Sequence, residues 1–434
     1  MGAQEVGAKL SFKRSVAAIK NKQAVRNKMR KPSGFQFAQG DSISQMSAPH
    51  WDAATSGASF FLQRDYLRML EKSGPENIES KYALIFQDDV PVAAVYMQIV
   101  TVSGKSVGSV SHDADESEGH FGLVRTMLSP MEDKLRDKAK QRFLVCGNML
   151  TYGFHGAAFA PGVQPSELWQ AVAEAVYRVR RSLKLSGQAD FQMIKDVTAN
   201  EEAGVEALRN LSYRPLETEP NMLLTLAPEW KNYDGYLASL ASKYRSSVRQ
   251  QILKPVEAAG CTVERITGLA AYEDRLHELY LQVHENASIR PFTLRKGYFA
   301  ALETTAGRNL TCTLMRKEGG ILGFIISLKD GELGFGYHIG FDKAASADLP
   351  VYLRLLHASV EDALALGCKQ LSLGRTALEP KARLGALPQP VTLWMRHTRP
   401  LTNVFVRKMF GLIRHDEAPD RNPFKTPAKA ETEA

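Results

Sequence analysis

Apolar residues recur along residues 166–185 at the spacing of a helix, so one face of this segment is apolar. The strand-like runs 142–146 and 189–194 stand before and after it. Residues three or four positions apart line one side of an α-helix, because the helix has 3.6 residues per turn. A strand, a helix and a second strand in this order predict a parallel β-α-β step. The apolar face consists of Leu168, Val172, Ala175, Val176, Val179 and Leu183.

Upstream of this step the pattern predicts a helix at 60–72, followed by two strands at 82–86 and 92–100. A polar turn at 87–89 separates the two strands and favours an antiparallel hairpin. Residues 101–141 are first rich in glycine and serine and then highly charged. Such a composition is typical of a loop, so we interpret this segment as an insertion.

A second series of elements begins near Pro220. Residues 236–254 place Leu240, Tyr244, Val248 and Ile252 four positions apart, and Pro255 is expected to kink or end this helix. Asp348 is expected to cap a later helix that Gly367 closes. The pattern further predicts helices at 275–283 and 293–302, and strands at 310–316, 321–328, 332–340, 370–373 and 391–397.

The two series repeat each other in order. The apolar positions of 60–70 match those of 292–302, and Gly153-Phe154-His155 matches Gly336-Tyr337-His338. We therefore predict a duplicated α/β domain, each copy with a mixed sheet of antiparallel hairpins and one parallel step, flanked by helices. The predicted organisation is a basic arm at 1–35, a first domain at 36–222 containing the insertion, a second domain at 223–414 and a disordered tail at 415–434.

Composition adds limits to this organisation. The chain has 434 residues, of which 44% are hydrophobic and 24% are charged, as in ordinary globular proteins of two or three domains. We find no apolar run as long as the roughly 18 residues that span a membrane, and no apolar region of a signal peptide. The four cysteines form no Cys-x-x-Cys pair, which argues against a metal site and against a disulfide framework. A cytoplasmic location is the expectation.

The net charge of +8 is concentrated at one end. Residues 1–32 contain nine Lys and Arg and one acid, so the other 402 residues carry 46 charges of each sign. A DNA-binding domain concentrates cations on its folded surface, and this body does not. We interpret residues 1–32 as a solvated arm. The alternatives are contact with tRNA or with an anionic membrane, which would associate the protein with the inner membrane surface.

Four local motifs occur in a characteristic order. Tyr236-Leu-Ala-Ser-Leu-Ala-Ser-Lys-Tyr-Arg245 opens the second series, and Gly336–Asp342, Gly367–Arg375 and Pro380–Ala386 follow. In this order they resemble the opening, the fourth strand, the fifth strand and the lysine–glycine motif of the GNAT (acyl-CoA N-acyltransferase) superfamily. The resemblance is to its tandem, Fem-like form, found in bacterial proteins described as FemAB-like or as peptidoglycan biosynthesis/recognition proteins. It covers most of 220–410 and, more weakly, 55–200.

The resemblance implies two tandem GNAT-like domains and transfer of an acyl group to an amine acceptor. The donor would be acyl-CoA or an acyl carrier protein, acting as a co-substrate and not as a tightly bound cofactor. The glycine-rich pyrophosphate loop of acetyl-CoA enzymes is missing after Gly340 and after Phe159. A Fem-like transferase that takes an aminoacyl group from tRNA to a peptidoglycan precursor or peptide is therefore an alternative. A non-catalytic protein that binds cell-wall or other polysaccharide is a third.

Ligands of open α/β sheets lie at the carboxyl ends of the parallel strands, here at Gly340 and Gly374. The resemblance implies that these two strands diverge, so that unpaired backbone N–H groups can bind a thioester carbonyl. Strict alternation would place Gly334, Gly336, His338 and Gly340 on one face of their strand and Tyr337 on the other. We name His338 and Tyr337 as candidate catalytic residues, because an imidazole can take a proton near neutral pH. Glycines that admit a packed helix are the structural alternative.

Several cations complete the candidate site, each with a structural alternative. Lys381 is a candidate catalytic residue that could contact the reacting carbonyl or a donor phosphate; otherwise it is an exposed charge. Arg375 suits bidentate anion binding, or a salt bridge. The remaining candidate substrate-binding residues, each of which could instead be structural or solvated, are Arg383, Lys243, Arg245, His284 and Arg290.

Overall fold

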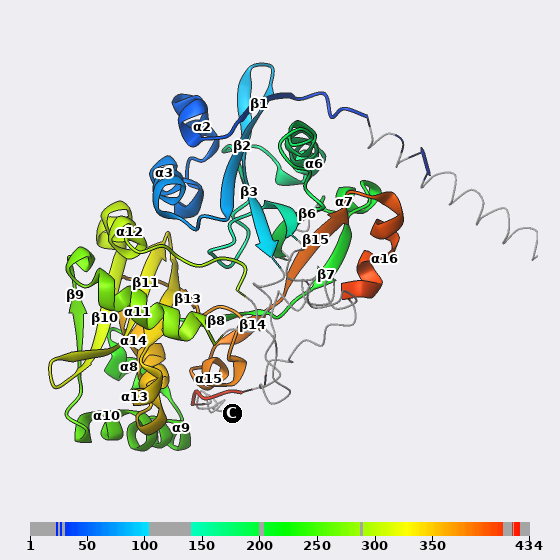
Figure 1. Ribbon diagram of the computed structural model, residues 1–434. Coiled ribbons are helices and arrows are strands. Elements are labelled where there is room, and N and C mark those ends of the chain that lie inside the picture. Colours follow the sequence, from blue (N-terminus) through cyan, green and yellow to red (C-terminus); the bar gives the residue numbers. More distant parts are fainter. Residues whose placement is uncertain are drawn as a thin grey trace, which may run out of the picture.

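The computed structural model describes residues 31–103, 140–198, 204–286, 290–410 and 421–425, together with positions 23, 24, 27 and 419. Two mixed β-sheets, each flanked by helices, lie side by side (Figure 1). This is the predicted fold class, with two tandem GNAT-like domains. None of the helices in these ranges is both long enough and apolar enough to cross a bilayer.

The first sheet has eight strands, seven of them in the spatial order β1-β2-β3-β4-β6-β15-β7, with β5 beside β3. Its helices include α6, whose apolar face packs on the sheet as the sequence pattern predicts. The strands are β1 (Gln36–Gly40), β2 (Ile78–Gln87), β3 (Val90–Ser103), β4 (Lys140–Cys146), β5 (Ala157–Phe159), β6 (Phe191–Thr198), β7 (Arg214–Glu217) and β15 (Val391–His397). The helices are α2 (Ala48–Ala54), α3 (Arg64–Ser73), α6 (Pro165–Ser182), α7 (Ala207–Asn210) and α16 (Pro400–Phe410).

The second sheet has seven strands in the order β14-β8-β13-β12-β11-β10-β9. These are β8 (Asn221–Thr225), β9 (Thr262–Ile266), β10 (Leu310–Lys317), β11 (Gly320–Asp330), β12 (Leu333–Phe341), β13 (Gln370–Ser372) and β14 (Leu387–Gln389). Its helices are α8 (Tyr233–Ser239), α9 (Ser242–Val248), η5 (Arg249–Leu253), α10 (Lys254–Ala258), α11 (Glu273–His284), α12 (Tyr298–Ala306), α13 (Lys343–Asp348), α14 (Val351–Ala365) and α15 (Leu378–Arg383).

The two sheets share one plan, which confirms the predicted duplication. In each, antiparallel strands are followed by a crossover that contains one long helix, α6 or α14, and then by a strand that pairs in parallel. The parallel pairs are β4 with β6 and β12 with β13. Between β3 and β4, residues 104–139 of the predicted insertion lie outside the described residues. Its two ends, Thr101–Ser103 and Lys140–Gln141, are not loop but extend these strands.

The domains exchange strands, which the sequence analysis did not foresee. Residues 391–397 were expected in the second domain, yet they form β15, which pairs with β6 and β7 of the first sheet. Conversely, β8 spans the expected boundary at 222/223 and pairs with β13 and β14 of the second sheet. A strand can join any sheet whose edge it reaches, so its position in the chain does not fix its domain.

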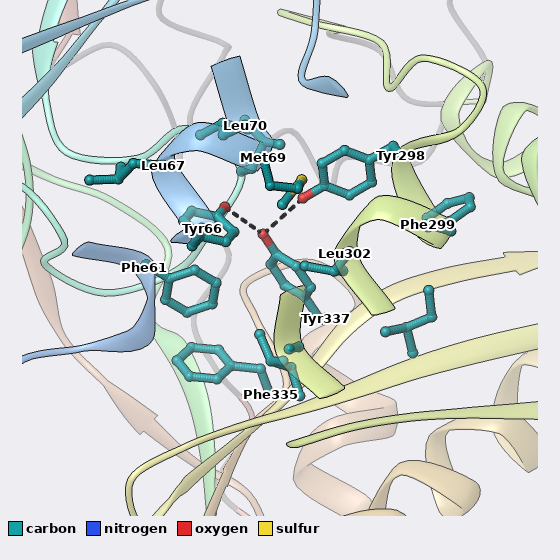
Figure 2. Close-up of a cluster of buried hydrophobic side chains, with 14 of the residues drawn as sticks. Phe61, Tyr66, Leu67, Met69, Leu70, Tyr298, Phe299, Leu302, Phe335 and Tyr337 are labelled. Atoms are coloured by element: carbon teal, nitrogen blue, oxygen red, sulfur yellow. Dashed lines mark hydrogen bonds between the residues drawn. The ribbon is translucent and has the colours of Figure 1, made fainter. Parts of the chain in front are cut away.

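A common hydrophobic core joins the two domains. Phe61, Tyr66 and Leu70 near α3 pack in one cluster with Tyr298 and Phe335 of the second domain, and all five side chains are buried. Figure 2 shows these side chains meeting between α3, α12 and β12. The core therefore fixes how the two sheets lie relative to each other.

The helix predicted at 236–254 is interrupted earlier and continues further than expected. The chain leaves the helical conformation at Leu240 and starts again at Ser242, and it then passes through Pro255 without ending. A proline lacks the N–H that a helix needs and its ring crowds the carbonyl four residues before it. The π-turn η5 accommodates this, because the Lys254 N–H bonds to the Arg249 carbonyl, five residues back.

Two other expected helix starts differ. Asp348 ends α13 and does not cap the following helix; the cap of α13 is Asp342, whose carboxylate accepts the N–H groups of Ala344 and Ala345. The helix expected at 293–302 starts only at Tyr298. Asp342 and Asp348 both suit the first position of a helix, so the sequence pattern alone does not show which of the two is the cap.

Part of the expected disordered tail docks on the second domain. The Ala241 N–H bonds to the Pro423 carbonyl at 2.9 Å, and the Lys425 N–H bonds to the Ser239 carbonyl at 3.0 Å. The Phe424 ring packs 5.2 Å from the ring of Trp230. The break between α8 and α9 thus exposes backbone groups that residues 423–425 satisfy. The other residues of 415–434, apart from 419 and 421–422, lie outside the described part.

Candidate active site

The strands β12 and β13 diverge at their carboxyl ends, as the sequence analysis expected. They pair only from Leu333 with Gln370 to Phe335 with Ser372, although β12 continues to Phe341. Beyond Ser372 the chain follows β8, since the Leu373 N–H bonds to the Met222 carbonyl at 2.9 Å. One edge of β12 is therefore left without a neighbouring strand after Phe335.

Backbone N–H groups point to this open edge. The Asp342 N–H donates to the Leu322 carbonyl at 2.7 Å, so it points toward β11. N–H groups alternate in direction along a strand, so those of Ile339 and Phe341 point the opposite way. Within the described ranges neither donates a hydrogen bond to a backbone or side-chain group. These two groups are the candidate donors to a carbonyl oxygen, whereas the Gly340 N–H points toward β11.

A β-bulge changes which side chains share a face of β12. Ile326 pairs with His338 and Ser327 pairs with Gly336, so Tyr337 is the extra residue. Gly336 consequently faces Ser359 of α14, while the His338 ring lies 5.8 Å from the ring of Phe299 in α12. The prediction that the glycines and His338 share one face is wrong, because a bulge shifts the alternation by one residue.

Two glycines expected to bind ligand instead permit close packing. A Cβ on Gly340 would lie 2.7 Å from the Tyr280 nitrogen, so α11 packs directly on this position. Gly374 has φ +76°, and a Cβ there would lie 2.6 Å from the Tyr152 ring of the first domain. For Gly340 this is the stated structural alternative, a glycine that admits a packed helix, whereas the packing of Gly374 against a ring of the first domain was not foreseen.

Lys381 is buried, so it is not the exposed charge that the sequence offered as its structural alternative. Its side chain is 3% exposed, and in the described part of the chain its Nζ has no hydrogen-bond or ion-pair partner. Burial lowers the pKa of Lys381 to about 7, because a charged ammonium without a counter-ion is costly in an apolar site. A lysine that is partly neutral at pH 7 can accept a proton, and such a shifted pKa is typical of functional sites.

His338 is buried on its ring-nitrogen side. Its Nε2 has no hydrogen-bond partner among the described residues, and burial lowers the pKa of His338 to about 3. An imidazole with this pKa is neutral at pH 7 but is a weak base, so it can form a hydrogen bond more readily than it can hold a proton.

The Tyr337 hydroxyl lies inside the domain interface. It is 3.2 Å from the Tyr66 hydroxyl and 3.3 Å from the Tyr298 hydroxyl, and Asn148 donates to Tyr66 at 2.9 Å (Figure 2). Burial raises the pKa of Tyr337 well above its usual range, so the phenol stays protonated. This arrangement assigns Tyr337 to the joining of the domains.

Arg375 forms a salt bridge, which was its structural alternative. Its guanidinium pairs with the buried Asp196 of β6 and lies 5.8 Å above the Tyr152 ring. Asp196 also pairs with Lys195, whose Nζ donates to the Thr151 carbonyl at 2.7 Å. The end of β13 is thus held to the end of β6 by buried charges, which need such partners to stay ionised.

The sequence analysis did not single out Tyr152, Lys195 or Asp196. The signal for the last two was available, because Lys195-Asp196 interrupts an otherwise apolar strand. His357 was also overlooked. It stands within the apolar pattern of α14, its Nδ1 is 2.9 Å from the Tyr233 hydroxyl, and burial lowers the pKa of His357 to about 3.

The remaining candidate cations do not converge on one point. Arg383 pairs with Glu379 at 2.8 Å, and Arg245 donates to the Leu240 carbonyl at 3.0 Å, which caps the end of α8. Lys243 is exposed on α9. On the other side of the domain, His284 stacks on the Tyr280 ring at 5.2 Å and lies 3.0 Å from Thr293.

His284 and Arg290 lie near the end of β12. Burial is the main cause of the lowered pKa of His284, and the nearby positive charge of Arg290 is the second cause. The Lys343 N–H, two residues beyond β12, donates to Gln282 of α11 at 3.1 Å. The end of α11 therefore flanks the end of the open edge, which keeps His284 and Arg290 as candidates for contact with substrate.

A cavity of about 310 Å³ opens between α9, η5, α14 and α15. Its walls are mainly apolar, and they include the buried His357 and the Glu379–Arg383 pair. The residues of the π-turn that line it are Gln251 and Ile252. No cluster of potential metal ligands occurs in the described ranges. The lining residues are Tyr244, Ser247, Val248, Gln251, Ile252, Leu353, Leu356, His357, Glu379, Pro380, Arg383 and Leu384.

Comparison with known proteins agrees with this architecture. Residues 242–382 match the family model described as "Acetyltransferase (GNAT) domain". The match covers most of the second domain, and the plan that the two sheets share gives the chain the fold of two tandem GNAT-like domains. No curated protein matches the chain.

Solved structures similar to this chain include FemX, which is 11% identical, with a TM-score of 0.49 over 85% of this chain and 100% of FemX. A tandem GNAT protein from the clavulanic acid biosynthesis pathway is 12% identical, with a TM-score of 0.45 over 84% and 99%. The C-terminal domain of a putative lysylphosphatidylglycerol synthetase from Agrobacterium fabrum is 10% identical, with a TM-score of 0.45 over 84% and 96%. The substrates of this chain are therefore argued from its own site.

Proposed function

We propose that the second domain transfers an acyl group from an activated thioester to an amine acceptor at the open edge of β12. The observation that carries this proposal is the divergence of β12 and β13, beyond which the N–H groups of Ile339 and Phe341 have no hydrogen-bond partner among the described residues. A thioester carbonyl bound there would have its developing oxyanion stabilised. One such donor typically lowers the barrier by about 3 kcal/mol.

The reaction needs a neutral amine, because an ammonium has no lone pair for attack. The amine nitrogen attacks the carbonyl carbon, a carbon–nitrogen bond forms and the oxyanion develops. The carbon–sulfur bond then breaks, the thiolate leaves, and the proton released from nitrogen passes to a base. Our candidate for this base is Lys381, because it is buried on α15, which follows the end of β13, and burial lowers the pKa of Lys381 to about 7.

The donor can be tested directly. Native mass spectrometry of the full chain with acyl-CoA, acylated carrier protein and charged tRNA identifies which donor binds, and thiol release follows turnover with a panel of amines. We expect Lys381→Gln to lower turnover at least about 100-fold. The control Lys369→Gln removes an exposed lysine paired with Glu332 and should leave turnover unchanged. Full activity of Lys381→Gln would overturn its assignment as the base.

A second candidate function is aminoacyl transfer from tRNA to a peptide or peptidoglycan precursor. It is favoured by the segment after β12, which forms α13 in place of a glycine-rich loop. The Asp342 carboxylate already accepts the N–H groups that begin α13. These hydrogen bonds lower the pKa of Asp342 by more than burial raises it. The N–H groups of Ala344 and Ala345, which a pyrophosphate at this position would need, are therefore already occupied.

The two functions predict different binding results. Binding of charged tRNA without binding of CoA or carrier protein would replace the thioester donor with the aminoacyl one, at the same open edge. Failure of all three donors to bind would contradict both and would favour a polysaccharide- or peptide-binding protein with this fold.

A further inference from the structure

The last described helix, α16, carries apolar side chains on two opposite faces. On its inner face Val406 is fully buried, and Asn403 accepts the His397 N–H at 2.8 Å and donates to the Ser212 carbonyl at 2.9 Å. These contacts fasten α16 beside β15 and β7, the last strands of the first sheet (Figure 1).

The outer face of α16 is exposed. Leu401 is 83% exposed, Val404 is 63% exposed and Phe405 is 56% exposed. Residues three and four positions apart lie next to each other on a helix, so these three form one stripe opposite Asn403 and Val406. A contiguous exposed apolar stripe of this kind marks an interaction surface.

The charge around this stripe limits what can cover it. Residues 391–415 contain five Lys and Arg and no Asp or Glu, and the Arg399 side chain is exposed at the start of the helix. A second copy of the chain would bring an equally cationic helix to the contact. The arm at 1–32 has the same sign. Like charges disfavour both occupants. The five cations are Arg396, Arg399, Arg407, Lys408 and Arg414.

We propose that α16 is a membrane-surface helix that binds an anionic lipid bilayer. Leu401, Val404 and Phe405 enter the boundary between headgroups and acyl chains. The exposed Arg399 at the start of the helix lies beside the anionic headgroups, and the other cations of 391–415 add positive charge to this segment. An exposed apolar stripe with flanking Lys and Arg and no acids is the pattern of helices that lie in the membrane interface. Each nearby Lys or Arg adds about 1 kcal/mol of attraction to an anionic surface. This inference concerns where the protein acts and is independent of the proposed reaction.

The test is co-sedimentation of the full chain with two kinds of vesicle. One is phosphatidylcholine alone, and the other contains about 30 mol% phosphatidylglycerol. We expect binding to the anionic vesicles only. The triple variant Leu401→Ser, Val404→Ser and Phe405→Ser should lower the partition coefficient at least about 10-fold, because it removes the apolar contribution. As a matched control, Leu387→Ser changes a 61% exposed leucine on β14 and should leave binding unchanged.

A second measurement places the helix in the bilayer. Phe405→Trp should show quenching by brominated phosphatidylglycerol, whereas the four native tryptophans are buried and should not. A variant with the nine cations of 1–32 changed to glutamine separates the arm from the helix. It should keep binding that the triple serine variant loses.

Three outcomes would overturn the proposal. The first is equal binding of the triple variant and the parent chain to anionic vesicles. The second is loss of all binding in the arm variant, which would assign the lipid contact to 1–32. The third is absence of vesicle binding. If no vesicle binding is found, a change of oligomeric state in the triple variant would indicate that a second copy of the chain covers the helix. Vesicle binding gained on deletion of 104–139 would indicate that this segment covers it.

Discussion

The hydroxyl of Tyr337 in the second domain lies 3.2 Å from the hydroxyl of Tyr66 in the first. Both phenols are buried in the core that the two domains share, and Tyr298 joins them from α12. A buried hydroxyl needs a partner to offset the cost of leaving water. The two domains are therefore joined by apolar packing and by a hydrogen-bonded network.

Tyr337→Phe should lower the free energy of unfolding by about 1–2 kcal/mol, because it leaves two buried phenols with one partner fewer. Urea unfolding followed by circular dichroism measures this loss, and both domains should unfold in one transition. Tyr272→Phe is the control, since the described structure gives its hydroxyl no hydrogen bond, and it should change stability by less than about 0.5 kcal/mol. Loss of acyl transfer at unchanged stability would instead assign Tyr337 to the chemistry.

Gly374→Ala should destabilise the fold by about 2–3 kcal/mol. The left-handed backbone costs an L-residue about 1–2 kcal/mol, and the new Cβ would overlap the Tyr152 ring. In the double variant, Tyr152→Ala should remove the steric contribution of Gly374→Ala to the loss of stability and leave the backbone contribution. The stability losses of the two single variants should therefore not add up in the double variant. Gly320→Ala is the matched control, because a Cβ there meets its nearest atom at 3.5 Å. Additive changes would show that the two residues do not touch in solution.

Lys381→Met should stabilise the protein while it removes activity. Burial lowers the pKa of Lys381 to about 7, so below that pH the fold holds an unpaired charge, and this penalty disappears as pH rises toward the unfolded pKa of 10.5. The gain should therefore be largest near pH 6, at roughly 2–4 kcal/mol, and should vanish near pH 11. Thermal unfolding across this pH range measures it, with Lys369→Met as the exposed control. A gain independent of pH would mean that Lys381 has the same pKa in the folded and the unfolded chain, so that burial does not shift it.

Phe424→Ala should destabilise the second domain by about 2–3 kcal/mol, because the ring packs against Trp230 and against Gly385, where any Cβ would overlap it. Gly385→Ala should have an effect of similar size for the same reason. Removal of residues 426–434 should leave the melting temperature unchanged. If that truncation destabilised the protein as much as Phe424→Ala, the tail would be held by residues beyond the described contact.

The divergence of β12 and β13 was implied by the resemblance to the GNAT superfamily. The order of apolar runs was sufficient to predict two α/β copies and their crossover helices. These features depend on local periodicity and on the rule that parallel strands need a crossover, and both can be read along the chain. The same periodicity could not show the bulge at Tyr337, since an extra residue in a strand changes no residue type.

The sequence alone thus determined the layered architecture and the candidate residues Lys381 and His338. Only the tertiary structure decided that β15 returns to the first sheet, that Arg375 binds Asp196, and that Lys381 is buried without a partner. The physical reason is that periodicity encodes which face of an element is buried, while the partner of a charge or of a strand edge depends on residues brought together from more than 150 positions away.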